Sequence, residues 1–157
     1  KDMQYVWSPH QQGALNAFPY IQHQGDVTGA SRALPGTETV LVHPEIAKNL
    51  GAPVALVFSV YSAVSNGAVS IASLQPKMRM QYGDQLVECV FNASVSAKAK
   101  SRFVYTYVIG IALIDEQGIT LQHSGMTSGR FSEDTPRIIW KKDQTVEIKV
   151  DGLPMFK

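Results

Sequence analysis

The sequence predicts an all-β fold: an antiparallel β-sandwich or jelly roll of seven or eight strands with one short helix. Two observations favour it: from Thr37 onward apolar residues recur with a period of two, and turn-forming residues return at roughly 8–15-residue intervals. A third is that no second amphipathic helix of ten or more residues can be found, which argues against a βαβ pattern. The alternative is an α+β domain with a single sheet.

The chain has 157 residues, the length of one domain, and its first 36 residues differ from the rest. Prolines and glycines alternate there without sustained periodicity, so residues 1–36 are predicted to form an extended, irregular arm and residues 37–157 a single β-sandwich domain. The arm is too apolar for a solvated linker, and we expect it to lie against its own domain or a neighbouring subunit. Its large apolar side chains are Tyr5, Trp7, Leu15, Phe18, Tyr20 and Ile21.

A short helix is predicted near residues 44–50. Pro44 suits the first helical position, and Ile46 and Leu50 share one face at i,i+4 spacing. Gly51 follows, and glycine is the residue that best adopts the left-handed conformation after a helix.

The next segment, Val54–Tyr61, is apolar at both alternating sets of positions, which indicates a central, buried strand. The dipeptide Asn66-Gly67 predicts a hairpin turn, because both residues tolerate positive φ. Val69 and Ile71 should then return antiparallel to the preceding strand.

Further strands follow from the same period of two. In residues 77–82 one side carries methionine and tyrosine and the other carries polar side chains, which predicts a half-exposed strand. Residues 102–114 form a long strand pattern in which Gly110 indicates a bulge or a bend. The other predicted strands cover residues 38–42, 86–94, 119–123, 137–140 and 146–150.

The chain carries little charge. There are 14 Lys and Arg residues against 13 Asp and Glu, which gives a net charge of +1 and argues against a uniformly basic nucleic-acid-binding surface. Only 17% of residues are charged, compared with roughly 25% in an average soluble domain. The longest apolar stretch, Phe103–Ile114, is too short for a membrane-spanning helix of about 20 residues.

Nothing in the sequence predicts catalysis, a cofactor or a metal site. The four histidines lack metal-ligand spacing, and Cys89 alternates with apolar residues as a buried, inert thiol would. The segment 125–129 is one residue too long for the G-x-S-x-G nucleophile motif and is interpreted as a flexible hairpin loop. Carboxylates fall mostly in turns, and Asn92 begins a glycosylation acceptor sequence.

Two groups of basic residues alternate, one along the predicted strand at residues 77–82 and one that would share a face if the strand at residues 102–114 began early. Both could contact nucleic-acid phosphates or an acidic partner. The net charge of +1 favours the alternative, which is that they lie on solvated strand faces or protect a strand edge. The residues are Lys77, Arg79, Lys98, Lys100 and Arg102.

The function predicted from these features is non-enzymatic assembly, as a self-associating homo-oligomer. The composition and the arm-plus-sandwich layout resemble the β-sandwich coat or matrix proteins of viruses, and no motif carries the resemblance. A periplasmic or secreted bacterial binding domain, from a lipoprotein or secretion system, is the alternative, and a jelly-roll enzyme a third. A virion, periplasmic or extracellular location is thus favoured over that of a cytoplasmic enzyme. The predicted interface residues are Tyr5, Trp7, Phe18, Tyr20, Met78, Met80 and Trp140.

Overall fold

The computed structural model describes residues 6, 11–25, 37–61, 70–74, 76–82, 85–89, 101 and 103–154. These residues contain ten strands and two short helices, which confirms the predicted all-β class. The chain divides into two compact units, residues 1–54 and residues 55–157. The sandwich or jelly-roll topology and the arm boundary at residue 36 remain predictions. No helix in the described part of the chain has the length and apolarity to cross a membrane.

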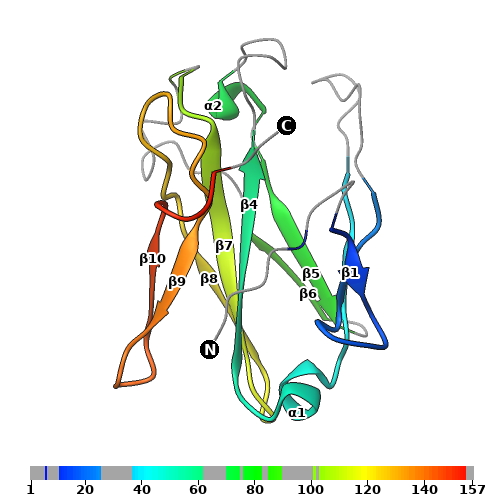
Figure 1. Ribbon diagram of the computed structural model, residues 1–157. Helices are drawn as coiled ribbons and strands as arrows, with labels where there is room; N and C mark the ends of the chain where they lie inside the picture. The colour runs from blue at the N-terminus through cyan, green and yellow to red at the C-terminus, as the bar shows by residue number, and fades with distance from the viewer. Residues whose placement is uncertain are drawn as a thin grey trace. The chain divides into compact units, whose positions relative to one another are not determined.

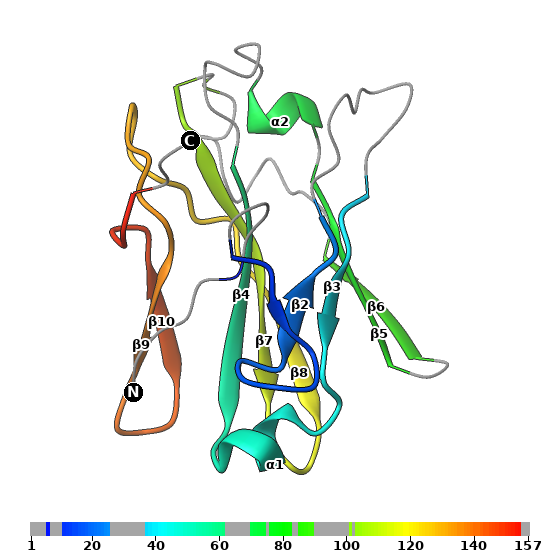
Figure 2. The same cartoon turned by 45° about the vertical axis from the view of Figure 1, so that its right-hand side comes forward.

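The first unit contains a small antiparallel sheet of β1 (Gly13–Ala14), β2 (Ile21–His23) and β3 (Val40–Val42), in that order (Figure 2). Two of its strands thus lie inside the range predicted to be an arm. Gly13 has a φ of 78°, and a Cβ there would collide with the Ile21 carbonyl oxygen. Only glycine therefore fits this close approach of β1 to β2.

The helix predicted near residues 44–50 is confirmed as α1 (Ile46–Leu50), in which Ile46 is buried. Gly51 adopts a φ of 68°, and its N–H donates to the Lys48 carbonyl at 3.1 Å. The Ala52 N–H donates to the Ala47 carbonyl at the same distance. These two bonds form a Schellman motif, which ends the helix at the predicted glycine.

The second unit contains a sheet in the order β4 (Val54–Tyr61), β7 (Thr106–Ile114), β8 (Ile119–His123) (Figure 1). β7 is the central strand and is buried along nearly its whole length. The prediction that Val54–Tyr61 is central is wrong for the described residues, where β4 ends the sheet order. An apolar pattern on both faces of a strand indicates that both faces are covered. It does not indicate whether the strand pairs with one neighbouring strand or with two.

Two further antiparallel pairs complete the described strands: β5 (Met78–Tyr82) with β6 (Gln85–Cys89), and β9 (Arg137–Trp140) with β10 (Val146–Lys149). Along β5, Met78 is buried and Arg79 and Gln81 are exposed, as the alternation predicts. The pairing of Arg79 with Glu88 brings their charged groups to 2.7 Å.

Ile71, predicted in a strand, lies instead in a second helix, α2 (Ile71–Leu74). Ser70 precedes this helix: its hydroxyl accepts from the Ser73 N–H at 3.3 Å, and its carbonyl accepts from the Ser73 hydroxyl at 2.7 Å. Such local serine bonds favour a helix start over a strand. The Asn66-Gly67 turn lies outside the described residues.

Two hydrophobic clusters pack on opposite faces of β7. Tyr107 and Ile109 belong to one cluster, and Val108 between them belongs to the other. The cluster of Tyr107 also contains Ile71 from α2 and Met78 from β5. The cluster of Val108 also contains Ile148 from β10. β7 is therefore covered from both sides within its own unit.

The pairing of β7 changes register near Gly110. Tyr107 pairs with Thr127 and Gly110 pairs with His123, so three residue steps along β7 match four along its partner. The extra residue lies in the segment that contains Gly125, which has a φ of 138°. The irregularity predicted at Gly110 is present, and the additional residue lies on the opposite strand.

Candidate interaction site

An aromatic pair with an arginine lies on the surface of the second unit. The rings of Phe103 and Phe131 are 4.8 Å apart between centroids. The Arg130 guanidinium lies 5.4 Å from the Phe103 centroid and 5.6 Å from that of Phe131, within the range of cation–π attraction. Phe131 is 62% exposed. We call these three residues the aromatic cluster.

The backbone presents Phe131 at a strained position. Its φ is 63°, a left-handed conformation that costs a residue with a Cβ about 1–2 kcal/mol. The Phe131 N–H donates to the Phe103 carbonyl at 2.8 Å, which fixes the turn against the segment before β7. A strained backbone that holds a large apolar side chain in solvent is a reason to look for a function there.

The segment leading into the cluster is fastened to β7. The Val108 N–H donates to the Met126 carbonyl at 2.8 Å, and the Ser128 N–H donates to the Thr106 carbonyl at 3.1 Å. The Ser128 hydroxyl is buried and accepts from the Thr106 N–H at 3.2 Å. The interpretation of residues 125–129 as a flexible hairpin loop is therefore corrected: a buried serine continues the hydrogen bonding of β7 beyond β8.

Beyond the cluster, Thr135 ties the chain to its carboxyl-terminal segment. The Thr135 hydroxyl donates to the Leu153 carbonyl at 2.7 Å, and the Gly152 N–H donates to the Thr135 carbonyl at 2.8 Å. These bonds hold Leu153 with 70% of its surface exposed. Leu153 is thus a second large apolar side chain that a fixed backbone presents to solvent.

Glu133 lies two residues after Phe131 and accepts a hydrogen bond from the Tyr61 hydroxyl at 2.9 Å. The Tyr61 ring packs edge-on against Tyr105, with centroids 6.4 Å apart. Burial, followed by the hydrogen bond to Glu133, raises the pKa of Tyr61 to about 12. The phenol therefore stays protonated and keeps its bond to Glu133 throughout the physiological range.

This raised pKa predicts a loss of stability in alkali. The unfolded tyrosine ionises near its ordinary pKa of about 10, so the folded state loses free energy relative to the unfolded state as pH rises from about 10 to about 12. Tyr61→Phe removes the titrating group, and its free energy of unfolding should fall less over that interval. Urea denaturation at several pH values measures the free energy of unfolding of each protein. If that free energy fell equally with pH in both proteins, Tyr61 would not be the group with the raised pKa.

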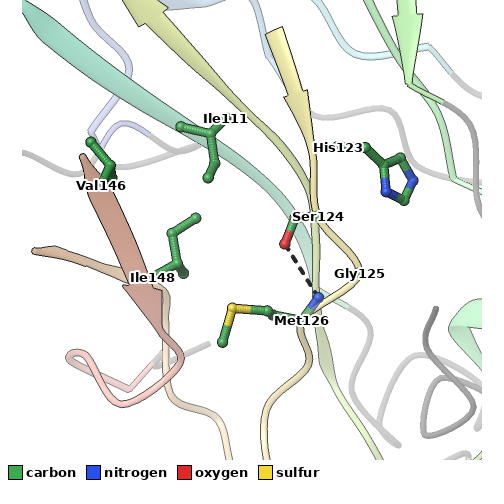
Figure 3. Close-up of a pocket in the computed structure, with 7 residues that line it drawn as sticks. All are labelled: Ile111, His123, Ser124, Gly125, Met126, Val146 and Ile148. Atoms are coloured by element: carbon green, nitrogen blue, oxygen red, sulfur yellow. Dashed lines mark hydrogen bonds between the residues drawn. The ribbon is translucent and has the colours of Figure 1, made fainter.

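A shallow, open depression of about 470 Å³ lies between β10 and the register change (Figure 3). Its apolar lining comes from Ile111, Met126, Val146 and Ile148, while His123 points to the other side of the strand. The Ser124 hydroxyl in its wall accepts from the Met126 N–H at 3.3 Å. The described lining offers apolar contact and no pair of groups arranged for acid–base chemistry.

The predicted interface residues fall in different environments. Trp140 is exposed, and in the first unit Phe18 is 59% exposed. Tyr20 is half-buried and packs edge-on against His43, 5.9 Å away between ring centroids. Met80 is half-buried. Tyr5 and Trp7 lie outside the described residues.

Met78 is covered by the chain itself. It is 7% exposed and packs with Ile71, Tyr107 and Ile109. Its alternation with Arg79 predicted an apolar face correctly, but the cover comes from this unit's own core. Met78 therefore has little surface left to contact a second copy.

The basic residues do not form a described patch. Arg79 is paired with Glu88, and Lys77 is exposed. Lys98, Lys100 and Arg102 lie outside the described residues, as does Asn92.

The described histidines make local contacts. His23 accepts from the Gly25 N–H through Nδ1 at 3.0 Å, and its Nε2 lies 3.3 Å from a Glu38 carboxylate oxygen. His43 accepts from the Glu45 N–H through Nδ1 at 3.0 Å. No group of three or more possible metal ligands occurs among the described residues.

Sequence reasoning missed the aromatic cluster. The sequence places Phe103 in the strand pattern of residues 102–114, and Phe131 in a stretch between the predicted strands at residues 119–123 and 137–140. The available signal was an arginine followed by an aromatic residue directly after Gly129. Comparison of the chain with protein-family models, with curated proteins and with solved structures gives no match.

Proposed function

We propose that this chain is a non-enzymatic structural protein that assembles with copies of itself, as a coat or matrix subunit of a virus does, and that the aromatic cluster lies in the contact between copies. The observation that carries the proposal is Phe131, which a left-handed backbone holds 62% exposed beside Arg130. Aromatic residues and arginine are enriched at protein interfaces and dominate their binding energy.

Burial of the Phe131 ring alone does not supply enough free energy to hold two copies together, so the contact must include a larger apolar surface. A phenylalanine side chain buries about 150–250 Å², so covering the exposed 62% of Phe131 contributes roughly 2–4 kcal/mol at about 25 cal/mol per Å². Association costs at least about 4 kcal/mol in lost freedom. Other exposed apolar side chains of the second unit must therefore contribute, and the described ones are Leu86, Ile119, Met126, Trp140 and Leu153.

Light scattering after size-exclusion chromatography, at a series of micromolar concentrations, tests self-association directly. We expect a mass above that of the monomer that rises with concentration. A monomer at every concentration would overturn the proposal. Point variants are better probes than deletion of residues 1–36, because that deletion would remove β1 and β2 from the sheet that contains β3.

Phe131→Gly is expected to abolish or strongly weaken association while leaving stability nearly unchanged. Glycine relieves about 1–2 kcal/mol of left-handed strain, which offsets its own entropic cost of about 0.5–1 kcal/mol and the lost ring contact. The measurements are light scattering for mass and urea denaturation for stability.

Phe18→Ala is the matched control, since Phe18 is a phenylalanine of similar exposure, at 59%, in the first unit. This variant should associate as the unmodified chain does. If Phe18→Ala dissociated while Phe131→Gly associated as the unmodified chain does, the contact between copies would lie in the first unit and would not include the aromatic cluster.

A further inference from the structure

The turn between β7 and β8 presents carboxylates and an apolar side chain together. The Asp115 carboxylate accepts from the N–H groups of Gln117 and Gly118 at 2.8 and 2.9 Å, which fixes the turn. Glu116 is exposed and has no ion pair with any described residue. Ile119, the first residue of β8, is 44% exposed. We call residues 115–119 the acidic turn.

The acidic turn and the aromatic cluster lie at opposite ends of one ladder. Ile114 pairs with Ile119 at one end of β7, and at the other Tyr107 pairs with Thr127, four residues before Phe131 (Figure 1). β7 has nine residues, which span roughly 30 Å at 3.3 Å per residue. The two surfaces are therefore too far apart to contact each other within one copy.

The two surfaces are complementary in charge and in apolar character. Among the described residues the Arg130 guanidinium contacts the faces of Phe103 and Phe131 and forms no ion pair with a carboxylate. A guanidinium stacked on a ring keeps its N–H groups free to donate to carboxylate oxygens. The acidic turn supplies such oxygens beside Ile119, and the cluster supplies the ring of Phe131.

We propose that copies of this chain join head to tail, with the acidic turn of one copy seated on the aromatic cluster of the next. The inference rests on the proposed self-assembly and names the two surfaces that meet. In such a heterologous contact each copy uses one of its two surfaces, so a pair of copies retains one free surface of each kind. Assembly then proceeds to open chains, or to rings where the rotation between copies closes.

Charge reversal at both surfaces tests the pairing. Arg130→Glu places like charges together, as does Glu116→Lys, and each should weaken association about tenfold or more. The double variant R130E/E116K restores opposite charges across the contact with reversed polarity, and its association should recover. Light scattering over a concentration series gives the apparent dissociation constant of each protein.

Mixing two charge-removing variants distinguishes a head-to-tail contact from a symmetric one. Arg130→Gln keeps an intact acidic turn, and Glu116→Gln keeps an intact aromatic cluster. In an equimolar mixture Glu116 of the first variant can pair with Arg130 of the second, while the two surfaces left over carry no opposite charges. The mixture should therefore form a dimer of one copy of each and grow little further. Assemblies of the unmodified size in the mixture, or no recovery in the double variant R130E/E116K, would overturn the head-to-tail pairing.

Controls separate the failure of this inference from that of self-assembly. Lys142→Glu reverses an exposed charge in the β9–β10 turn and should leave the dissociation constant unchanged. Arg130→Gln removes the charge with little change in shape, and it keeps the test valid if R130E fails to fold by circular dichroism. Association of the unmodified chain that neither Arg130 variant nor E116K affects would refute the pairing and leave the proposed function standing. A monomeric unmodified chain would refute both.

Discussion

Replacing Tyr107 with alanine is expected to lower the free energy of unfolding by about 3–5 kcal/mol, the range for deleting a large aromatic side chain from a packed core. Tyr107 is fully buried at the centre of the sheet and packs with Ile71, Met78 and Ile109. Its loss leaves a cavity against α2 and β5, which cannot collapse without moving both. Such a loss is a large fraction of the total free energy of unfolding of a native domain, which is roughly 5–15 kcal/mol.

Urea denaturation followed by far-ultraviolet circular dichroism measures this change through the shift of the midpoint. Phe131→Gly is the comparison, because it removes an aromatic ring from the surface and is expected to change stability little. A loss below about 1 kcal/mol for Tyr107→Ala would be typical of a surface substitution. It would show that the cluster around Tyr107 is not the packed core of this unit.

Local patterns predicted the elements that local forces determine. β4, β8 and β9 have the bounds that the period of two predicts, and α1 ends at Gly51 because that glycine adopts the left-handed φ. These signals lie within a few residues of the structure they specify. The helix at Ile71 was not predicted, because the strand interpretation rested on the hairpin signal of Asn66-Gly67. The hydrogen bonds of Ser70 favour a helix start there instead.

Features that depend on distant pairing could not be read from the sequence. The aromatic cluster joins residues 28 positions apart, through a hydrogen bond from the Phe131 N–H to the Phe103 carbonyl. A phenylalanine at positive φ has no sequence signature, because such a conformation is disfavoured for it wherever it occurs. The burial of Met78 likewise depends on β7, far along the chain, covering its face.

Several of the charged side chains in the second unit pair with one another. Arg137 on β9, for example, donates to the Asp151 carboxylate through two bonds of 2.9 and 3.0 Å. This arginine also lowers the pKa of Asp151 through those bonds. Because paired charges produce little field at a distance, the unpaired ones set the electrostatics of contact between copies. Arg130 and Glu116 are unpaired charges of opposite sign among the described residues, at opposite ends of β7.

The hydrophobic cluster of Val108, Ile111 and Ile148 should contribute to stability about as much as the cluster around Tyr107. Ile148→Ala should lower the free energy of unfolding by about 2–5 kcal/mol, while Ile148→Val should cost about 0.5–1.5 kcal/mol. Ile148 is buried in β10 and packs with Val108 and Ile111 on the face of β7 opposite Tyr107.

The double variant of Tyr107→Ala and Ile148→Ala tests whether the two faces of β7 are energetically independent. The two clusters share no residue, so the two losses should add to within about 0.5 kcal/mol. The variants Ile148→Val and Tyr107→Ala provide a milder pair if the double alanine variant is unfolded in water. A coupling energy above about 1 kcal/mol would mean that β7 shifts as a body when either face is emptied, and that the two clusters act as one core through the strand between them.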